Sequence, residues 1–439
     1  MNIGARALAG RPQVWAVGGG KGGTGKSLVA ASLGIHLAQM GRRVILVDGD
    51  LGAPNLHTIL GMDPPPLALS DFIKRRFDSI ETVVFETGVE RLSLISGARN
   101  SLDIESLKHF QKTRLLRVLL GLPADVVLLD LGAGTSLNVL DLFSLADRAL
   151  LVILPEPTSV ENCYRFLKAA FLRRLYHLGR TLGHQPIIDL VMEHRDQADD
   201  GRPYEIIEEI ARVDSCVAAT LASHVDTFLP HLVINQVRSH EDERLGESME
   251  WISDRFIRIP MRFAGAIPYD PTLVQCVKSR QAYLSEYPRT RTAEMLRAVA
   301  ESFSSPRAGP RGGAGPRTPE RDAYSALDLR PGAMQEEVLT AYLRLRRTLR
   351  SDSPALASLD CEAERQATVA AIEEAYRSLS RNLTVPSPVR RSRFPCSRNV
   401  VPPRRRGGRP SARRRVDIPG DRITLDSMGA AHRLPVADL

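Results

Sequence analysis

The first 300 residues alternate between short runs of β-branched and aliphatic residues and longer segments in which apolar positions have helical spacing. Several short runs are apolar at every position, which is typical of parallel strands covered by helices on both faces. Repeated strand–helix units predict a doubly wound α/β domain with a mainly parallel sheet. The predicted strands are Val14–Val17, Val44–Val47, Leu92–Ile95, Val126–Leu129, Leu150–Leu154, Leu232–Val237 and Ala264–Ile267. The predicted helices include Ser27–Gln39, Asn138–Ala146 and Ser159–Tyr176.

The composition divides the rest of the chain into four segments around this α/β domain, which we expect to span residues 14–303. Residues 1–13 form an N-terminal extension. Residues 304–320 are rich in glycine, proline and arginine, as is typical of a flexible linker. Residues 321–383 have the apolar spacing of short helices. Residues 384–439 offer little to bury and are predicted to be a disordered, arginine-rich tail.

The positive charge of the chain is concentrated in this tail. The formal net charge is +8, yet residues 390–439 alone carry thirteen arginines and only four aspartates. The remainder of the chain is therefore close to neutral. The tail could bind a membrane surface or nonspecific DNA through salt-sensitive contacts, or it could remain solvated.

Two classes of protein are disfavoured by the composition. The five cysteines lie far apart and form no C-x-x-C pair, which argues against a disulfide framework and against a zinc or iron–sulfur site. No apolar run approaches the roughly 20 residues of a membrane-spanning helix, and the first residues lack the order of a secretory signal. We therefore expect a cytoplasmic protein, with reversible association with the inner membrane or cell pole as a further expectation.

A glycine-rich loop follows the first predicted strand and precedes the first predicted helix. Its residues fit the pattern G-x(4)-G-K-[ST], and strand–loop–helix is the setting in which this pattern binds phosphate. Glycines let successive backbone N–H groups converge on phosphate oxygens, and the helix N-terminus adds partial positive charge. We predict a site for ATP and Mg²⁺, with Lys26 on the β- and γ-phosphates and the Ser27 hydroxyl on Mg²⁺. The predicted ATP-binding loop consists of Gly20, Lys21, Gly22, Gly23, Thr24, Gly25, Lys26 and Ser27.

The loop contains a second lysine, Lys21, that phosphate binding by one subunit does not require. On spacing alone, Lys21 could be a solvated charge that adds to the positive field. The segment "KGGTGKS", however, resembles the deviant Walker A motif of the MinD/ParA family of P-loop NTPases. The resemblance implies an ATPase that forms a homodimer on binding ATP. In such a dimer Lys21 would reach the nucleotide of the second copy and make hydrolysis depend on dimerisation.

The segment "VILVDGDLGAPNL", residues 44–56, resembles the second motif of this family, a strand that ends in D-x-D. The resemblance implies that Asp50 orients or deprotonates the attacking water and that Asp48 lies near Mg²⁺. It also implies that Asn55 lies near the γ-phosphate. On the residues alone, the two aspartates could instead belong to a solvated turn between a strand and a loop.

The segment "DVVLLDLGAG", residues 125–134, is a buried strand that ends in an acid followed by glycines. It resembles a Walker B strand and the switch that follows it. The resemblance implies that Asp130 holds a Mg²⁺-bound water and that Gly132 and Gly134 let the backbone respond to the γ-phosphate. Many members of the family have threonine where this chain has Leu131, so the switch departs from the family at that position.

Three further segments extend the resemblance to residues 14–303. "VINQVR" and "GAIPYD" are similar to motifs on the adenine side of the pocket, which makes Asn235 and Asp270 candidate contacts to base or ribose. "PEPTSVENCYRFLKAAFLRRL" resembles the start of the next helix in the MinD-like branch. Its apolar stripe fits either core packing or a partner or membrane surface. The resemblance is greatest for the FlhG/FleN-like branch, which controls the number and placement of flagella.

Residues 321–383 resemble a J-domain in the order of their helices. The His-Pro-Asp signature of J-domains falls on Arg350, Ser351 and Asp352, so two of its three residues are replaced. Stimulation of an Hsp70-type chaperone is therefore not expected. We interpret this segment as a degenerate J-domain-like module for protein contacts, and a generic helical hairpin is the alternative.

Together these features predict a dimerising switch that binds and slowly hydrolyses ATP to control the position or number of a cellular structure, with flagella as the leading expectation. An activating partner protein is also expected. The first alternative is a ParA-type partition ATPase that binds DNA nonspecifically. The others are a metabolic or metal-carrier enzyme on the same fold and an adaptor that binds nucleotide without hydrolysis. The lack of a C-x-x-C pair disfavours a carrier of iron–sulfur clusters or metal, and Lys21 and Asp50 disfavour the adaptor.

Overall fold

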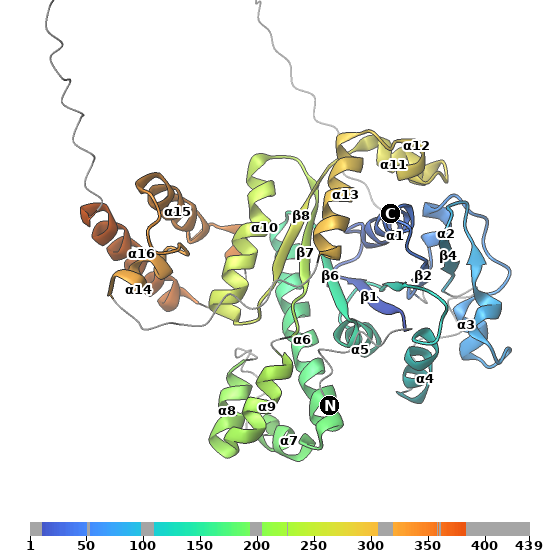
Figure 1. Ribbon diagram of the computed structural model, residues 1–439, viewed down its shortest axis with the longest axis horizontal. Helices are drawn as coiled ribbons and strands as arrows, with labels where there is room; N and C mark the ends of the chain where they lie inside the picture. Colours follow the sequence, from blue (N-terminus) through green and yellow to red (C-terminus); the bar gives the residue numbers. More distant parts are fainter. Residues whose placement is uncertain are drawn as a thin grey trace, which may run out of the picture. The chain divides into compact units, whose positions relative to one another are not determined.

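One eight-stranded sheet organises most of the described chain (Figure 1). The computed structural model describes residues 11–50, 53–97, 109–193, 204–225, 227–305, 319–357, 359 and 361–382. The strand order is β3-β4-β2-β5-β1-β6-β7-β8, and every neighbouring pair is parallel except β3 and β4. The strands span Gln13–Gly18 (β1), Val44–Asp48 (β2), Phe85–Glu86 (β3), Leu92–Ile95 (β4), Val126–Asp130 (β5), Arg148–Ile153 (β6), His231–Val237 (β7) and Arg262–Pro268 (β8).

Both faces of the central strands are buried, as their uninterrupted apolar runs predict. In β1, Val14 and Ala16 belong to one apolar cluster, whereas Trp15 and Val17 belong to the other. This alternation requires a helical layer on each side of the sheet. One layer contains α1 (Lys26–Gln39) and α13 (Arg291–Ser304), and the other contains α5 (Leu137–Leu145), α6 (Pro157–Leu182) and α10 (His240–Ile252). The predicted doubly wound α/β fold is therefore confirmed.

The seven predicted strands all overlap strands of the sheet, and the short antiparallel edge strand β3 was not predicted. The predicted helices begin and end within a few residues of α1, α5 and the start of α6. Short helices connect the remaining elements. They are α2 (Leu56–Ile59), α3 (Leu69–Ile73), α4 (His109–Leu119), α11 (Pro271–Lys278) and α12 (Tyr283–Glu286), together with the 3₁₀-helix η1 (Ile80–Val83) and the π-helix η3 (Ser253–Ile257).

A group of three helices between α6 and β7 was not predicted. Helix α6 continues past Tyr176 to Leu182, and α7 (Gln185–Glu193), α8 (Glu205–Val213) and α9 (Ser215–Val225) gather around its C-terminal end (Figure 1). The group coheres because α8 is strongly amphipathic. Ile206 and Ile210 are buried in the apolar cluster, whereas Glu208 is exposed.

Three helices, which we call the helical module, follow residue 318. They are α14 (Pro319–Ala326), α15 (Gln335–Thr348) and α16 (Glu362–Asn382), with the 3₁₀-helix η4 (Pro354–Leu356) between the last two. The rings of Tyr342 and Tyr376 stack with centroids 4.2 Å apart and join α15 to α16. The described residues all belong to one compact unit. The interpretation of the module as J-domain-like stays a prediction.

Several predicted segments lie outside the described residues. These are most of the N-terminal extension (residues 1–10), most of the linker (residues 306–318) and the tail (residues 384–439). None of the helices that the structure describes is both long and apolar enough to cross a membrane.

Candidate functional site

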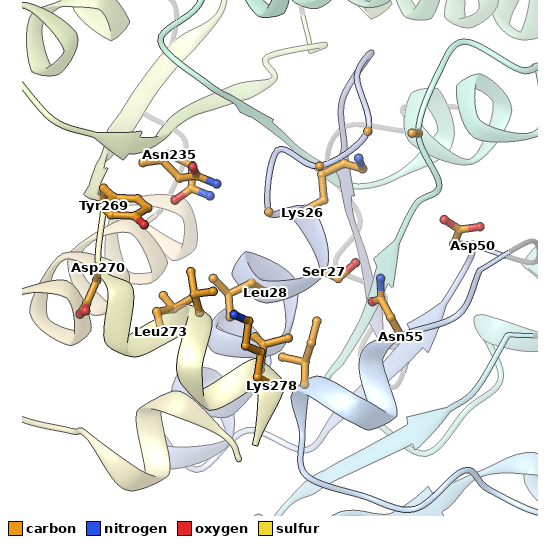
Figure 2. Close-up of a pocket in the computed structure, with 18 of the residues that line it drawn as sticks. Lys26, Ser27, Leu28, Asp50, Asn55, Asn235, Tyr269, Asp270, Leu273 and Lys278 are labelled. Atoms are coloured by element: carbon orange, nitrogen blue, oxygen red, sulfur yellow. The ribbon is translucent and has the colours of Figure 1, made fainter. Parts of the chain in front are cut away.

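A cavity of about 500 Å³ lies where the glycine-rich loop leaves β1 and enters α1. β1 lies between β5 and β6, at the point where the strand order changes direction, which is the usual ligand site of doubly wound sheets. Figure 2 shows Asn235 and Tyr269 on one side of the cavity and Asp50 and Asn55 on the other. The predicted site residues that line it are Gly22, Gly23, Gly25, Lys26, Ser27, Asp50, Asn55, Asn235 and Asp270.

The glycine-rich loop has a backbone that only glycine adopts easily. Gly23 and Gly25 have φ angles of 76° and 88°, in the left-handed region. Lys26 is buried, and its Nζ donates a hydrogen bond to the carbonyl oxygen of Lys21 at 3.1 Å. Burial lowers the pKa of Lys26, although the nearby Asp130 and Asp50 oppose this shift. A buried ammonium inside a glycine loop at a helix N-terminus is suited to phosphate.

Asn235, a predicted base or ribose contact, holds the loop in this structure. Its Nδ2 donates to the carbonyl oxygen of Thr24 at 2.8 Å, and the side chain is buried. A Cβ at Gly25 would lie only 2.3 Å from that Nδ2, so this close approach requires glycine. Asn235 therefore fixes the loop from β7, and its contact with the nucleotide stays a prediction.

Asp48 and Asp130 lie side by side at the carboxyl ends of β2 and β5. Asp48 Oδ2 accepts hydrogen bonds from the backbone nitrogens of Asn55 (2.9 Å) and Leu56 (3.1 Å), at the start of α2. Burial raises the pKa of Asp48 to about 7. Burial and the neighbouring Asp48 raise the pKa of Asp130 to about 8, because two close carboxylates away from water cannot both ionise cheaply.

These side chains fit the predicted Mg²⁺ site. Asp130 Oδ1 is buried without a hydrogen-bond partner, and the Ser27 hydroxyl favours the ionised form of Asp130 and so partly lowers its pKa. A divalent cation would supply positive charge beside these buried carboxyl groups and so stabilise their ionised form. Among the described residues, no group of three His, Cys, Asp or Glu side chains could hold a metal ion unaided. Such a donor set suits Mg²⁺, which usually retains waters and is shared with substrate phosphates.

Asp50 and Asn55 approach the cavity from the loop after β2. Asp50 is half-buried, and its Oδ1 accepts a hydrogen bond from the backbone nitrogen of Ala53 at 3.0 Å. A Cβ at Gly132 would lie 3.5 Å from the carboxyl carbon of Asp50, so the predicted switch passes directly beside it. Gly134 has a φ of 89°. The structure thus brings Asp50 and the switch together, and their catalytic roles stay predictions.

Lys21 points away from the phosphate loop of its own subunit. Its Nζ lies 2.9 Å from Glu156 Oε2 and donates to Thr158 Oγ1 at 3.2 Å. Both partners stand at the start of α6, within a segment that the sequence analysis singled out, but neither was predicted to contact Lys21. Lys21 and Glu156 are 135 positions apart, so the spacing of residues along the sequence does not predict their contact.

Asp270 is engaged as a helix cap. Its Oδ1 accepts from the backbone nitrogen of Thr272 at 2.8 Å, and its Oδ2 accepts from the Tyr283 hydroxyl at 2.5 Å. Burial would raise the pKa of Asp270, but the hydrogen bonds from Tyr283 and Thr272 outweigh burial and the net pKa is lowered. A direct contact with the base or ribose stays a prediction for a carboxylate whose two oxygens are already hydrogen-bonded.

Gln236 and Tyr269 are among the cavity residues that were not predicted. Gln236 has a φ of 59° at an irregularity in the β7–β8 pairing, between Asn235 and Val237. Such an irregularity re-aims side chains and often lies beside a functional site. The guanidinium of Arg238 lies over the Tyr269 ring, 4.2 Å from its centroid. The quoted segments "VINQVR" and "GAIPYD" contain these residues, but the irregularity itself cannot be read from composition.

Comparison with known proteins covers this whole site. Residues 15–282 match the family described as "CobQ/CobB/MinD/ParA nucleotide binding domain". The matched range contains the glycine-rich loop, both buried carboxylates, Asn235 and Asp270.

Individual relatives match more or less of the chain. The antiactivator FleN of Pseudomonas aeruginosa is 26% identical over 295 residues, which cover 67% of this chain and 86% of FleN. The septum site-determining protein MinD of Helicobacter pylori is 31% identical over 147 residues, 33% of this chain and 54% of that protein. The solved structure of MinD from Pyrococcus horikoshii, complexed with Mg-ADP, is 20% identical with a TM-score of 0.47, covering 67% of this chain and 96% of that one.

Proposed function

Because the chain belongs to the CobQ/CobB/MinD/ParA nucleotide-binding family, we propose that it is a switch whose two subunits pair over bound ATP. Family membership confirms the coarser predictions. The protein is a P-loop ATPase of the MinD/ParA type, with ATP and Mg²⁺ as its cofactors. We further propose the role of each pocket residue and the cellular structure that the switch controls.

The position of Lys21 carries the proposal of a paired switch. Lys26 is buried in the loop, whereas the Lys21 side chain is 36% exposed and bonded to the start of α6. One lysine therefore serves the phosphates of its own subunit, and the other stands at the rim. A cation at the rim can complete the pocket of a second copy, as an arginine finger does.

The other residues of the pocket have separate roles in binding and hydrolysing ATP. The loop backbone and Lys26 bind the phosphates, and Asp50 orients the attacking water beside Gly132. Ser27, Asp48 and Asp130 hold Mg²⁺ directly or through water. When bound, Mg²⁺ would offset the negative charge that develops on the phosphates. Gly134 gives the switch the freedom to respond to the γ-phosphate.

The Lys21→Ala variant tests this proposal. We expect ATP binding to change little, because the Lys21 side chain is bonded to the start of α6 and does not line the cavity. Hydrolysis should fall about tenfold or more. Lys74→Ala, at an exposed lysine that does not line the cavity, is the control and should hydrolyse ATP at the wild-type rate. Unchanged turnover in Lys21→Ala would remove the proposed role of this lysine.

The similarity to FleN, which extends over most of both chains, supports the control of flagellar number or placement by a cytoplasmic protein that visits the inner membrane or cell pole. Deleting the gene in the source organism and counting flagella tests this role. Altered flagellar number or position is expected, restored by the wild-type chain and not by Lys21→Ala. Normal flagellation after deletion would contradict it.

The arginine-rich tail favours a second candidate, a partition ATPase. Eleven arginines and no carboxylate lie between residues 390 and 415, a composition suited to nonspecific DNA binding. A gel-shift assay with ATP and increasing salt distinguishes the two candidates. Salt-sensitive retention of DNA, lost when residues 390–415 are removed, would support partition.

A further inference from the structure

The turn between α15 and α16 of the helical module contains three buried apolar residues, although other residues of the turn are exposed. Ala355 in η4 has no exposed surface, and Leu349 and Leu356 are nearly as buried. η4 contacts both α6 and α10 of the α/β domain. The apolar residues of the module belong to the same cluster as those of α6 and α10.

Two polar contacts fix this turn on the α/β domain. The hydroxyl of the buried Tyr164, on α6, donates to the carbonyl oxygen of Ala355 at 2.8 Å. The hydroxyl oxygens of Ser248, on α10, and Thr348, at the end of α15, lie 2.9 Å apart. Because a buried carbonyl that loses its donor is costly, these contacts specify one docked position.

The residues at the position of the J-domain signature are paired with each other. The guanidinium of Arg350 makes two hydrogen bonds to the Asp352 carboxylate, at 2.9 and 2.7 Å, and both side chains are exposed. The docking contacts come from the residues just before and after this pair. The loop that would engage a chaperone in a J-domain is here attached to the chain's own α/β domain.

The helix that receives the module also holds the phosphate loop. Within its first two turns, α6 contacts Lys21 through Glu156 and Thr158. A Cβ at Gly20 would lie 2.5 Å from the carbonyl oxygen of Asn162, so the loop rests directly on this helix. Tyr164 follows Asn162 by two residues. The same short stretch of α6 therefore touches the loop on one side and the module on the other.

We propose that the helical module is an intramolecular inhibitor that, when docked on α6 and α10, stabilises the arrangement in which Lys21 is held within its own subunit. Freeing Lys21 for a second copy breaks its contacts with Glu156 and Thr158, and a docked module holds these partners in place. Coupling is reciprocal, so pairing over ATP and Mg²⁺ weakens docking by the same factor by which docking weakens pairing. The inference rests on the proposed role of Lys21.

A reversible crosslink in the full-length chain tests the inference directly. The double variant Ser248→Cys/Thr348→Cys places two thiols where the hydroxyl oxygens are 2.9 Å apart. Oxidation should lower ATP turnover about fivefold or more, and reduction should restore it. The single variant Ser248→Cys, treated identically, is the control. Equal turnover of the crosslinked and reduced forms would overturn the inference.

A variant that releases the module should act in the opposite direction. Ala355→Glu puts a charge into the buried turn, so we expect turnover to rise about fivefold or more at protein concentrations where the wild type is mostly monomeric. Leu343→Glu, on the exposed side of α15, is the matched control. Circular dichroism verifies that Ala355→Glu is folded. Wild-type turnover in a folded Ala355→Glu protein would count against the inference.

The rate of disulfide formation separates this inference from the proposed function. In the double variant, the crosslink should form more slowly with ATP and Mg²⁺ than without nucleotide. If the rate is the same while a fluorescent ATP analogue binds, the coupling is wrong and the ATPase proposal stands. If Lys21→Ala hydrolyses ATP normally while nucleotide still slows the crosslink, the trans role of Lys21 is wrong. Inhibition through Lys21 is then wrong too, although docking and nucleotide binding are still coupled.

Discussion

The phosphate end and the base end of the cavity are built in different ways. At the phosphate end, Lys26 and the carboxylates of Asp48 and Asp130 are fixed by the glycine loop and by the register of β2 against β5. At the base end, Asn235 and Asp270 are engaged in holding the loop and capping α11. The other side chains at that end include Gln236, which lies at an irregularity in the β7–β8 pairing, and residues of α11.

We therefore expect the phosphate end to determine the rate of hydrolysis and the base end to determine which nucleotide binds. Buried charges in the regular sheet act on the phosphates, where charge develops during hydrolysis, so a change there should alter the rate by orders of magnitude. Residues such as Gln236 approach from a strained position, where a change should alter which nucleotide binds. The predictions below test this division from the largest expected effect to the smallest.

Asp130→Asn should have the largest effect. It should lower the ATPase activity and raise the stability of the nucleotide-free protein. Hydrolysis should fall roughly 10²-fold or more, because a carboxylate proposed to hold Mg²⁺ at the phosphates is lost. The nucleotide-free protein should become more stable at pH 8, because Asp48 no longer faces a second buried carboxyl. Steady-state ATPase assays and thermal unfolding measure both, with the exposed Asp63→Asn as control. Full activity in Asp130→Asn would contradict the assignment.

The pH dependence of the nucleotide-free protein should reflect the same two carboxyl groups. Their pKa values are raised to about 7 and about 8, so between pH 4 and pH 8 the folded state binds more protons than the unfolded state. The free energy of unfolding should therefore decrease as pH rises, by up to roughly 1.4 kcal/mol per pH unit for each group. Urea unfolding at several pH values measures the slope. With Mg²⁺ and ATP bound, the slope should shrink, and an unchanged slope would contradict the Mg²⁺ site.

Gln236→Ala should act on selectivity and leave the maximal rate nearly intact. Losing an amide that lines the base end should reduce the preference for ATP over GTP about tenfold, because hydrogen-bond readout of the base is lost. Competition binding with the two nucleotides measures the ratio. Gln275→Ala, an exposed position on α11 outside the cavity, is the matched control. An unchanged ratio would show that Gln236 does not read the base.

The phosphate end was predictable from sequence, and the base end only in part. A run of apolar residues that ends in Asp48, and another that ends in Asp130, place both carboxyls at one edge of a parallel sheet whatever the details of packing. The left-handed conformation of Gln236 arises from a local mismatch between β7 and β8, which no residue type announces.

Contacts between distant segments were the other part that the sequence did not reveal. Glu156 holds Lys21, and Ala355 accepts from Tyr164, because tertiary packing brings them together. The helices α7 to α9 were a different case. The spacing of Ile206, Ile207 and Ile210 is a readable helical signal, yet no helix was predicted between Tyr176 and Leu232.

Mixing two inactive variants tests most directly the central claim that Lys21 acts on the nucleotide of a second copy. Lys21→Ala keeps an intact water-orienting Asp50, and Asp50→Ala keeps an intact Lys21. Each alone should be nearly inactive, whereas an equal mixture should regain about a quarter of the wild-type rate, since half of the dimers then contain one complete pocket. A mixture no more active than its separate components would contradict the claim.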